Sequence, residues 1–455
     1  MEKGTTTAGL AKVSALFDPG TFAEIGSLIR RADGELTGVV CGYGAVDGKL
    51  VYAFAQDSDR RKGAFDALQA EKIASLYAMA IKNGAPVVGM FDSAGAILAD
   101  GSTVLSAYGK LLKTVSDASG VIPQIAVVTG VCAGLSATVA AMFDLTVTVK
   151  GSSELFVNAP FLIGKEAGEA TYVAATGLSS VLAENETDAI VKVKTLLSLL
   201  PSNNAEGVIA EEITDDVNRT VSVDGLTGAD LLGQITDAGT YLLVGAGYAD
   251  EMLTAFGRFG GVVCGIVASN AAEKGGVLTA DGAKKAAKMI SFCDSFSIPV
   301  ITLTDSVGVQ VSAEAEAAPL AAQLGKLAMA YASADCAKIT VVTGKAYGAA
   351  FTLMGSKALG ADMVYALPSA EISVMDPAAA VAFLWNDRIT PSVTRASLEE
   401  EWIEKHASPE AAACDGSIDD VIDPAELRQR ICSAVYMLLV KNGAAPLRKH
   451  CNLPL

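Results

Sequence analysis

The chain repeats itself at a nearly constant spacing. Adding 213 to the residue number carries several residues of the first half onto identical residues of the second half, namely Gly44 onto Gly257, Asp92 onto Asp305 and Gly95 onto Gly308. After one inserted residue the offset is 214, and the segment VVTG at 127–130 returns at 341–344. A period of about 200 residues is that of a whole domain rather than of a solenoid repeat. The sequence therefore predicts two copies of one domain, divided in the polar stretch PSNNAEGVIAEEITDD that follows Leu200.

The segment IAVVTGVCAGLSATVAAMF at 125–143 indicates how each copy is built. A valine-rich run is broken by Gly130 and Gly134 and followed by an apolar stretch of helical length, which is typical of a strand, a turn and a buried helix in an α/β protein. The first N–H groups of such a helix have no partner within it and stabilise a negatively charged oxygen. Most such joints are only tight turns. Because the second copy repeats the turn at Gly348, a reaction that forms two oxyanions would have a use for both.

Turn and helix signals around this segment complete the α/β pattern. We expect a hairpin that turns at Asp47-Gly48, a helix from Asp66 to Lys82 that is stopped by Asn83-Gly84, a strand over 87–91 and a helix over 105–115. Strands that alternate with helices favour a mostly parallel sheet covered by helices. The predicted fold class is therefore α/β, with two tandem domains from an internal duplication.

Composition and charge exclude several classes of protein. Hydrophobic residues make up 51% of the chain and charged residues 19%, so a large core can be buried. The net charge of −17 argues against a nucleic-acid partner, because phosphate backbones are bound by basic surfaces. No apolar run reaches the roughly 20 residues of a membrane helix, and we expect a cytoplasmic protein without direct membrane insertion. The eight cysteines show no metal-ligand spacing and are expected to be reduced core residues.

One dense basic cluster, Arg60-Arg61-Lys62, stands immediately before Gly63 in this acidic chain. Three adjacent basic residues are more often a solvated loop than a binding site. The alternative is a contact with a phosphate group of an anionic small molecule.

Six segments carry a family resemblance: LFDPGTFAEI, SGVIPQIAVVTGVCAG, GVLTADGAKKAAKMISFCDSFSIPVITLTDSVG, KITVVTGKAYGAAFTLMGSKALGAD, SAEISVMDPAAAV and RKHCNLPL. In this order they resemble the carboxyltransferase subunit (β-type) of biotin-dependent acyl-CoA carboxylases, which belongs to the crotonase superfamily. The match extends over nearly the whole chain. The resemblance implies two tandem crotonase-like domains of the ClpP/crotonase fold. It assigns acyl-CoA to the N-terminal half, residues 1–205, and biotin to the C-terminal half, residues 206–455.

The resemblance also implies a reaction and its site. In that family, carboxybiotin releases CO2, the biotin anion removes the α-proton of the acyl-CoA, and the enolate attacks CO2. No metal and no side-chain base are implied. The catalytic N–H pair for the CoA thioester would be Gly134 and Leu135, and the pair for the biotin ureido oxygen would be Ala349 and Ala350. The implied substrate-binding residues are Arg60, Arg61, Lys62, Gly63, Ala64, Gly95 and Thr352.

The chain departs from the family pattern where substrates would bind. The family usually has a double glycine in both helix-start turns, whereas this chain has CAGL at 132–135 and YGAA at 347–350. Side chains at these positions restrict φ and narrow the approach of a ligand. The family's glycine-glycine-serine loop is Lys62-Gly63-Ala64 here, and Ile97 stands where an arginine is expected. Thr352 occupies a position that varies with acyl-chain preference, and its small side chain leaves room for a short acyl group.

Partners follow from the same resemblance. Biotin would be carried on a separate biotin carboxyl carrier protein that biotin carboxylase loads. The tetrapeptide Ala-Ala-Lys-Met around Lys288 looks like a biotinylation site, but it lies in a predicted helix, whereas carrier lysines sit at hairpin tips. The subunit would form a homo-hexamer, a ring of dimers, with each site between the first half of one subunit and the second half of its partner.

Three other functions compete with this one. The same site run in reverse would serve the decarboxylating subunit of a biotin-dependent sodium-pumping decarboxylase, and the sequence hardly separates the two directions. A hydratase or isomerase of the crotonase type needs a carboxylate base after the glycine turn, and residues 135–143 and 349–357 contain none. A non-catalytic assembly subunit with the same fold is the third, because fold alone does not guarantee function. Asp92 and Asp305 are interpreted as turn or capping residues rather than as catalytic acids.

Overall fold

The computed structural model describes residues 6–164, 166–441 and 454, and the chain forms two compact units. The first unit comprises Met1–Gly207 with Gly245–Tyr248, and the second comprises Val208–Val244 with Ala249–Leu455. The main junction lies in the polar stretch after Leu200. The short segment that returns to the first unit is held there by a hydrogen bond from the Gly245 N–H to the Ser180 carbonyl at 2.7 Å.

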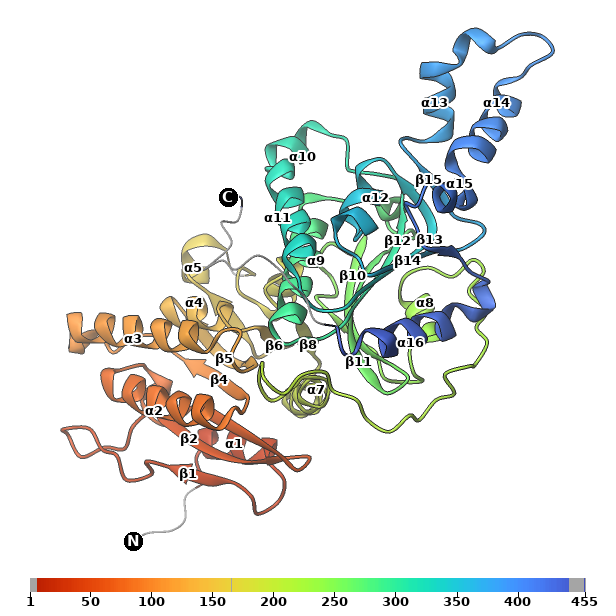
Figure 1. Ribbon diagram of the computed structural model, residues 1–455. Coiled ribbons are helices and arrows are strands. Elements are labelled where there is room, and N and C mark those ends of the chain that lie inside the picture. The colour runs from red at the N-terminus through yellow and green to blue at the C-terminus, as the bar shows by residue number, and fades with distance from the viewer. Residues whose placement is uncertain (1–5, 165, 442–453, 455) are drawn as a thin grey trace. The chain divides into compact units, whose positions relative to one another are not determined.

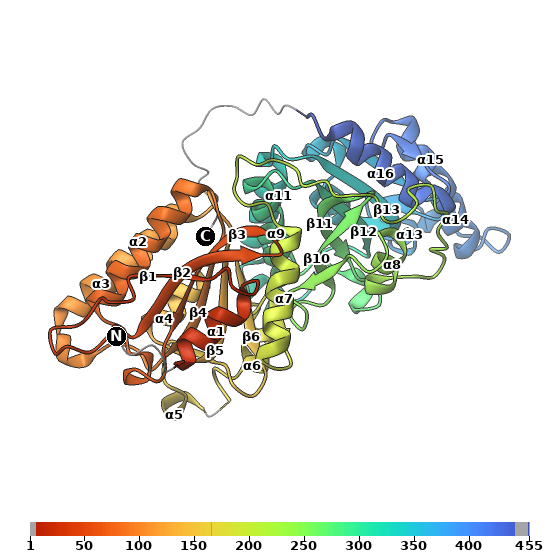
Figure 2. The ribbon, with the colours of Figure 1, turned by 90° about the horizontal axis from the view of Figure 1, so that it is seen from below.

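The first unit is built on an eight-stranded sheet with strand order β1-β2-β3-β4-β5-β6-β8, in which β7 pairs with β5 (Figure 1). The first three strands are antiparallel and the others run parallel. Helices α2 and α3 cover one face, and α1 and α7 cover the other (Figure 2). The strands are β1 (Ala23–Ile25), β2 (Val39–Val46), β3 (Lys49–Gln56), β4 (Val87–Ser93), β5 (Gln124–Ala133), β6 (Leu145–Val149), β7 (Glu154–Phe156) and β8 (Val181–Ala183). The helices are α1 (Ala8–Leu16), α2 (Ala67–Asn83), α3 (Ser102–Ala118), α4 (Leu135–Ala141), α5 (Pro160–Ile163), α6 (Ala170–Ala175) and α7 (Glu186–Leu199).

The second unit repeats this sheet strand for strand, with order β16-β14-β13-β12-β11-β10-β9 and β15 paired with β13. The strands are β9 (Leu242–Val244), β10 (Met252–Phe259), β11 (Val262–Ser269), β12 (Val300–Ser306), β13 (Lys338–Tyr347), β14 (Met363–Ala366), β15 (Glu371–Ser373) and β16 (Asp420–Val421). The helices are α8 (Gly228–Ile235), α9 (Ala280–Ser295), α10 (Ala313–Ala317), α11 (Leu320–Ser333), α12 (Ala349–Leu353), α13 (Pro377–Leu384), α14 (Arg395–Trp402), α15 (Pro409–Cys414) and α16 (Leu427–Leu438). The predicted α/β class and its internal duplication are confirmed.

Local signals explain several element boundaries. Asp66 caps α2 by accepting the Gln69 N–H at 2.8 Å, and Gly84 ends the helix in the left-handed conformation with φ of 60°. The hairpin between β2 and β3 turns at Asp47 and Gly48, whose φ values are 47° and 78°. Both elements were predicted from these residues and are confirmed.

One boundary differs from the prediction. Gly130 does not end the strand, because β5 continues to Ala133. The reason for a glycine there is packing, since a Cβ at position 130 would lie 2.2 Å from Oδ1 of Asp92. The second unit repeats this close approach between Gly344 and Asp305.

The largest difference between the units is a helical insertion between β15 and β16, which we call the lobe and define as residues 377–414. It contains α13, α14, a π-helical turn at Ile403–Ala407, and α15, and it projects from the sheet in Figure 1. Its small core consists of Ala380, Val381, Leu398, Trp402 and Ala407. The sequence did not predict the lobe, because its short helices have no counterpart in the first half.

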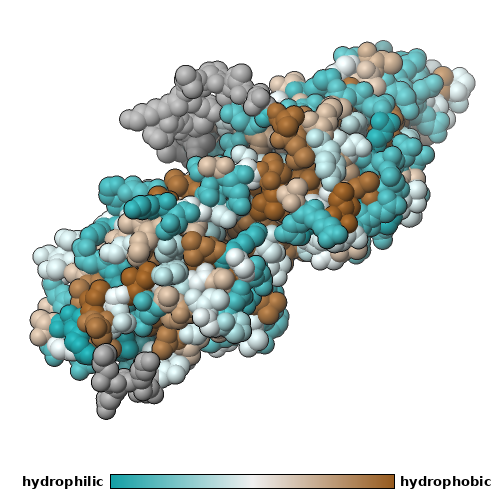
Figure 3. Space-filling model, turned by 60° about the horizontal axis from the view of Figure 1, so that its bottom comes forward, coloured by the Kyte–Doolittle hydropathy of each residue, from teal (hydrophilic) through white to brown (hydrophobic). Residues whose placement is uncertain are grey.

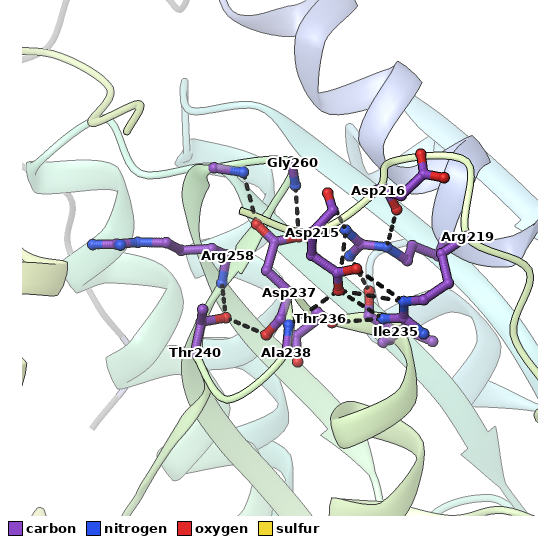
Figure 4. Close-up of polar contacts among 12 residues, drawn as sticks. Asp215, Asp216, Arg219, Ile235, Thr236, Asp237, Ala238, Thr240, Arg258 and Gly260 are labelled. Atoms are coloured by element: carbon purple, nitrogen blue, oxygen red, sulfur yellow. Dashed lines mark hydrogen bonds and ion pairs between the residues drawn. The ribbon is translucent and has the colours of Figure 1, made fainter. Parts of the chain in front are cut away.

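A buried ion pair joins distant parts of the second unit (Figure 4). Asp237 accepts the N–H groups of Gly260 and Gly261 at 2.9 and 2.7 Å in the turn between β10 and β11. The fully buried Arg428 of α16 donates to Asp237 at 2.6 Å and to the Ile235 carbonyl at 3.0 Å. Through Asp237, helix α16 is thereby connected to the turn between β10 and β11.

Seven cysteines lie in the described part of the chain and all are free thiols. Six of them are buried as expected, but Cys414 at the end of the lobe is exposed. Cys451 lies outside the described residues. No helix in the described ranges is long and apolar enough to cross a membrane.

Candidate active site

Of the two N–H groups predicted as donors in the turn between β5 and α4, only one is free to bind an oxyanion. Gly134 stands before the helix with φ of 60°, and its N–H donates to the Phe156 carbonyl of β7 at 2.9 Å. Leu135 is the first residue of α4, and its N–H has no hydrogen-bond partner among the described residues. The expectation that Gly134 offers a free donor is therefore corrected, because the returning strand β7 already uses that N–H.

A second free donor lies in the loop after β4. The Phe65 N–H donates to the Gly95 carbonyl at 2.8 Å, and the Ile97 N–H donates to the Phe65 carbonyl at 2.9 Å. In such a parallel bridge the N–H of the residue between, Ala96, points away from Phe65. It has no partner within the described ranges. We call the N–H groups of Ala96 and Leu135 the first cradle; sequence reasoning missed Ala96, although its place after β4 and Gly95 was a usable signal.

The second unit repeats these contacts. The Gly348 N–H donates to the Ser373 carbonyl of β15 at 2.8 Å, and Leu278 bridges Gly308 and Gln310 as Phe65 bridges Gly95 and Ile97. The N–H groups of Val309, Ala349 and Ala350 are among those without a hydrogen-bond partner in this part of the described chain, and we call these three the second cradle. The predicted donors Ala349 and Ala350 are therefore the first two residues of α12.

The basic cluster is already engaged in part. The buried Asp57 pairs with Arg60 at 3.3 Å, and Asp33 pairs with Arg61. Lys62 has no ion-pair partner among the described residues, and it adopts a left-handed conformation with φ of 54° where the second unit has Gly275. Of the three predicted cations, Lys62 is thus the one left available to an anion.

Glycine is required next to this cluster. A Cβ at Gly63 would lie 2.0 Å from the Asp92 carbonyl oxygen, and the Ala94 N–H donates to the Lys62 carbonyl at 3.0 Å. The loop from Arg60 to Ala64 therefore packs on the turn that contains Gly95. The structure brings together six of the seven predicted substrate-binding residues in this region, and Thr352 lies in the other unit.

Helix α1 contacts both the loop before Arg60 and the end of β4. The Ala8 N–H donates to Asp59 at 2.7 Å, and Lys12 donates to Asp92 at 2.7 Å and to Thr129 at 3.0 Å. In the second unit Asp305 instead accepts the Lys345 N–H at 2.8 Å. The Asp92 carboxylate therefore pairs with Lys12, and the Asp305 carboxylate bonds the backbone of β13, so their interpretation as turn or capping residues rather than catalytic acids stays a prediction.

A cavity lies beside each group of predicted residues. In the first unit a cavity of about 320 Å³ is lined by Arg60, Arg61, Ala64 and Ile97. In the second unit a cavity of about 550 Å³ is lined by Gly348, Thr352, Ser373 and His406. His406 is far from the glycine turns in sequence, but the lobe brings it to the cavity beside α12. No cluster of metal-ligating side chains is found in the described ranges.

Comparison with solved structures defines the class of protein. The fold matches the crystal structure of transcarboxylase 12S, a hexamer with methylmalonyl-coenzyme A and methylmalonic acid bound, with a TM-score of 0.93, 35% identity, and coverage of 99% of this chain and 93% of that one. A single-chain, multi-domain long-chain acyl-CoA carboxylase shares the fold with a TM-score of 0.82 at 23% identity, over 94% of this chain and 45% of that one. The class is that of a two-domain carboxyltransferase.

The family follows from the sequence comparisons. The model of the carboxyl transferase domain matches residues 1–453, and the chain belongs to that family. The carboxyltransferase subunit of propionyl-CoA carboxylase from Haloferax mediterranei is 34% identical, over 100% of this chain and 94% of the relative. Methylmalonyl-CoA decarboxylase subunit alpha from Veillonella parvula is 35% identical, over 98% and 92%. The resemblance recognised from the sequence, a biotin-dependent carboxyltransferase of the acyl-CoA carboxylase type, is confirmed.

Proposed function

We propose that this chain moves a carboxyl group between biotin on a carrier protein and the α-carbon of a short acyl-CoA. The observation that carries the proposal is the duplication of one backbone arrangement, in which free N–H groups stand at the start of a helix and after the preceding strand. Each cradle can stabilise one oxyanion. Biotin, when bound, supplies the carboxyl group and afterwards the base for the α-proton, so the chain itself needs no side-chain acid or base.

The first cradle would hold the thioester oxygen. As the α-proton leaves, negative charge develops on that oxygen, and the N–H groups of Ala96 and Leu135 stabilise it without reorganising. The second cradle, with Ala349 and Ala350, would hold the ureido oxygen of biotin. These roles assign acyl-CoA to the first unit and biotin to the second.

The loop from Arg60 to Ala64 would receive the phosphate groups of CoA. Lys62 supports this assignment, because its ammonium group has no ion-pair partner within the described ranges although its backbone is in a conformation costly for a side chain. Thr352 lines the cavity beside α12 in the second unit, and its small side chain would leave room for a short acyl group of an acyl-CoA held by the first unit of a partner subunit. Relatives named for propionyl-CoA and methylmalonyl-CoA point to the same substrate class.

The decarboxylating direction is the second candidate. A methylmalonyl-CoA decarboxylase subunit is as similar to this chain as the carboxylase and transcarboxylase subunits are. The same two cradles serve both directions, because the transition states are shared. In either direction we expect the protein to work in the cytoplasm with a biotin carboxyl carrier protein, and in the carboxylating direction with biotin carboxylase.

Exposed hydrophobic side chains support an assembly of several subunits. In the first unit Leu98, Val157, Phe161 and Leu162 are exposed near the first cradle. In the second unit Val311 and Val374 occupy the positions that the repeat carries from Leu98 and Val157, and they are exposed as well. Figure 3 shows such hydrophobic patches between polar residues on the face drawn. We infer a homo-hexamer built as a ring of dimers, in which the first unit of one subunit faces the second unit of its partner.

The test removes one N–H donor from each cradle and keeps the helix that follows it. Proline is tolerated at the first position of a helix and removes the N–H. We expect Leu135→Pro and Ala349→Pro to lower kcat for decarboxylation of malonyl-CoA or methylmalonyl-CoA with free biotin by about 10²–10³-fold, because each removes one oxyanion donor. Leu135→Ala and Ala349→Gly keep the N–H and are the matched controls.

The alternatives make different predictions. A non-catalytic assembly subunit shows no turnover with any acyl-CoA and no micromolar binding of acyl-CoA in calorimetry. Turnover that survives both proline substitutions in a folded protein would reject the cradles.

A further inference from the structure

Side-chain hydrogen bonds hold the strand next to the second cradle, and the first cradle has no equivalent of them among the described residues. The Trp402 indole N–H donates to Ser373 Oγ at 3.2 Å, and the Tyr347 hydroxyl donates to Glu371. Both bonds end on β15, the strand whose Ser373 carbonyl accepts the Gly348 N–H. The repeat carries Tyr347 onto Ala133 and Ser373 onto Phe156, so neither bond can form in the first unit.

The lobe holds Trp402 firmly. The ring is buried in the lobe core and packs edge-on against Trp385, with ring centroids 5.0 Å apart. The centroid of the His406 ring lies 4.7 Å from that of Trp402 and 5.9 Å from that of Trp385, and Arg388 lies 4.2 Å over the Trp385 ring. A side chain packed in this way transmits the position of the lobe to whatever its N–H contacts.

We propose that Trp402 and Ser373 are positioning residues for the second cradle, so that the lobe sets the direction of the Ala349 N–H. This inference rests on the proposed function, in which that N–H stabilises an oxyanion. The path is short, because Trp402 holds the Ser373 hydroxyl, the Ser373 carbonyl holds the Gly348 N–H, and the peptide that follows Gly348 carries the Ala349 N–H. Since the peptide unit is planar, rotation at Gly348 turns the next N–H directly.

The conformation of Gly348 explains why a tether is useful, by which we mean the hydrogen bonds from Trp402 to Ser373 and from Gly348 to the Ser373 carbonyl. Its φ and ψ are 57° and −133°, a region that glycine enters freely and leaves freely. The short helix α12 offers little restraint of its own, because it contains only five residues. The bonds of β15 to Gly348, Tyr347 and Trp402 supply that restraint. The first unit differs in helix length, since α4 has seven residues.

Matched tryptophan variants test the proposal. Trp402→Phe removes the N–H and keeps a ring, Ser373→Ala removes its acceptor, and Trp385→Phe makes the same chemical change in the same cluster without a bond to β15. We expect each of the first two to lower kcat by about three- to tenfold with an unchanged KM for acyl-CoA, because alignment of one donor is impaired. The double variant should be no slower than either single variant. Trp385→Phe should stay within about twofold of the unchanged protein.

Hydrogen exchange gives a readout that does not depend on turnover. In the full-length protein, amides of residues 347–353 should exchange about tenfold faster in Trp402→Phe and Ser373→Ala than in Trp385→Phe, because the tether no longer limits local opening. Unchanged exchange in this segment, additive losses in the double variant, or a parallel rise in KM would overturn the proposal. An unchanged protein without activity on any acyl-CoA would reject the proposed function, while the exchange result would still decide whether the tether exists.

Discussion

Lys285 of α9 shows what a buried charge costs this fold. The residue is only 9% exposed, and burial lowers the pKa of its ammonium group from 10.5 to about 8, although Asp250 and Glu251 oppose the shift. In the unfolded chain the pKa returns to 10.5. Between these two values the unfolded state binds more protons, so the folded state gains stability as the pH rises through that window.

Replacing this lysine should therefore stabilise the protein at neutral pH. We expect Lys285→Met to raise the free energy of unfolding at pH 7 by up to about 3 kcal/mol, because the cost of desolvating the charge disappears. The gain should shrink at pH 10, where the folded lysine is neutral. Urea unfolding at the two pH values measures both effects, and the exposed neighbour on the same helix, Lys284→Met, is the control. An equal gain at both pH values would contradict the explanation.

At the scale of elements, the C-terminal helix α16 depends on one ion pair. Arg428 and Asp237 are both almost fully buried, and Asp237 also caps the turn between β10 and β11. The first unit has the same turn cap in Asp18, which accepts the N–H groups of Asp47 and Gly48 but has no arginine partner among the described residues. The arginine is thus an addition of the second unit that docks its last helix.

Removing this arginine should leave a buried charge without its main partner. We expect Arg428→Met to lower the free energy of unfolding by about 3–5 kcal/mol, because Asp237 keeps its burial and loses its counter-ion. Arg430→Met, on the same helix, should change it by less than about 0.5 kcal/mol, since its partners are exposed. Thermal and urea unfolding would measure both. A small effect of Arg428→Met would mean that water or nearby N–H groups already satisfy Asp237.

At the scale of the whole molecule, the exposed hydrophobic side chains near the first cradle call for a partner surface. Phe161 is 84% exposed on α5, and Leu162 and Ile163 follow it. A contiguous apolar segment of this kind on a chain with net charge −17 is typical of an oligomer interface.

Charge on this segment should break the assembly. We expect Phe161→Glu to convert the proposed hexamer into smaller species in light scattering and to reduce activity at least tenfold, because each proposed site needs two subunits. Leu28→Glu introduces the same charge at another exposed leucine and should leave the assembly intact. Full activity in a monomeric Phe161→Glu protein would contradict a shared site.

Much of the fold was determined by neighbouring residues and could be predicted from them. The cap at Asp66, the stop at Gly84 and the turn at Asp47-Gly48 act over a few residues, and the duplication is visible in the residue numbers alone. The family was recognised from segments spread over the whole chain. These features need no knowledge of which distant residues meet.

Only the tertiary structure decided which groups remain free for chemistry. The Phe156 carbonyl accepts the Gly134 N–H, and Asp33 forms an ion pair with Arg61. The N–H of Ala96, in contrast, has no hydrogen-bond partner among the described residues. From far along the chain, the lobe brings His406 to the cavity beside α12 and Trp402 to β15. A hydrogen-bond donor is available only if no other part of the molecule uses it, and that depends on contacts between residues that the sequence does not place side by side.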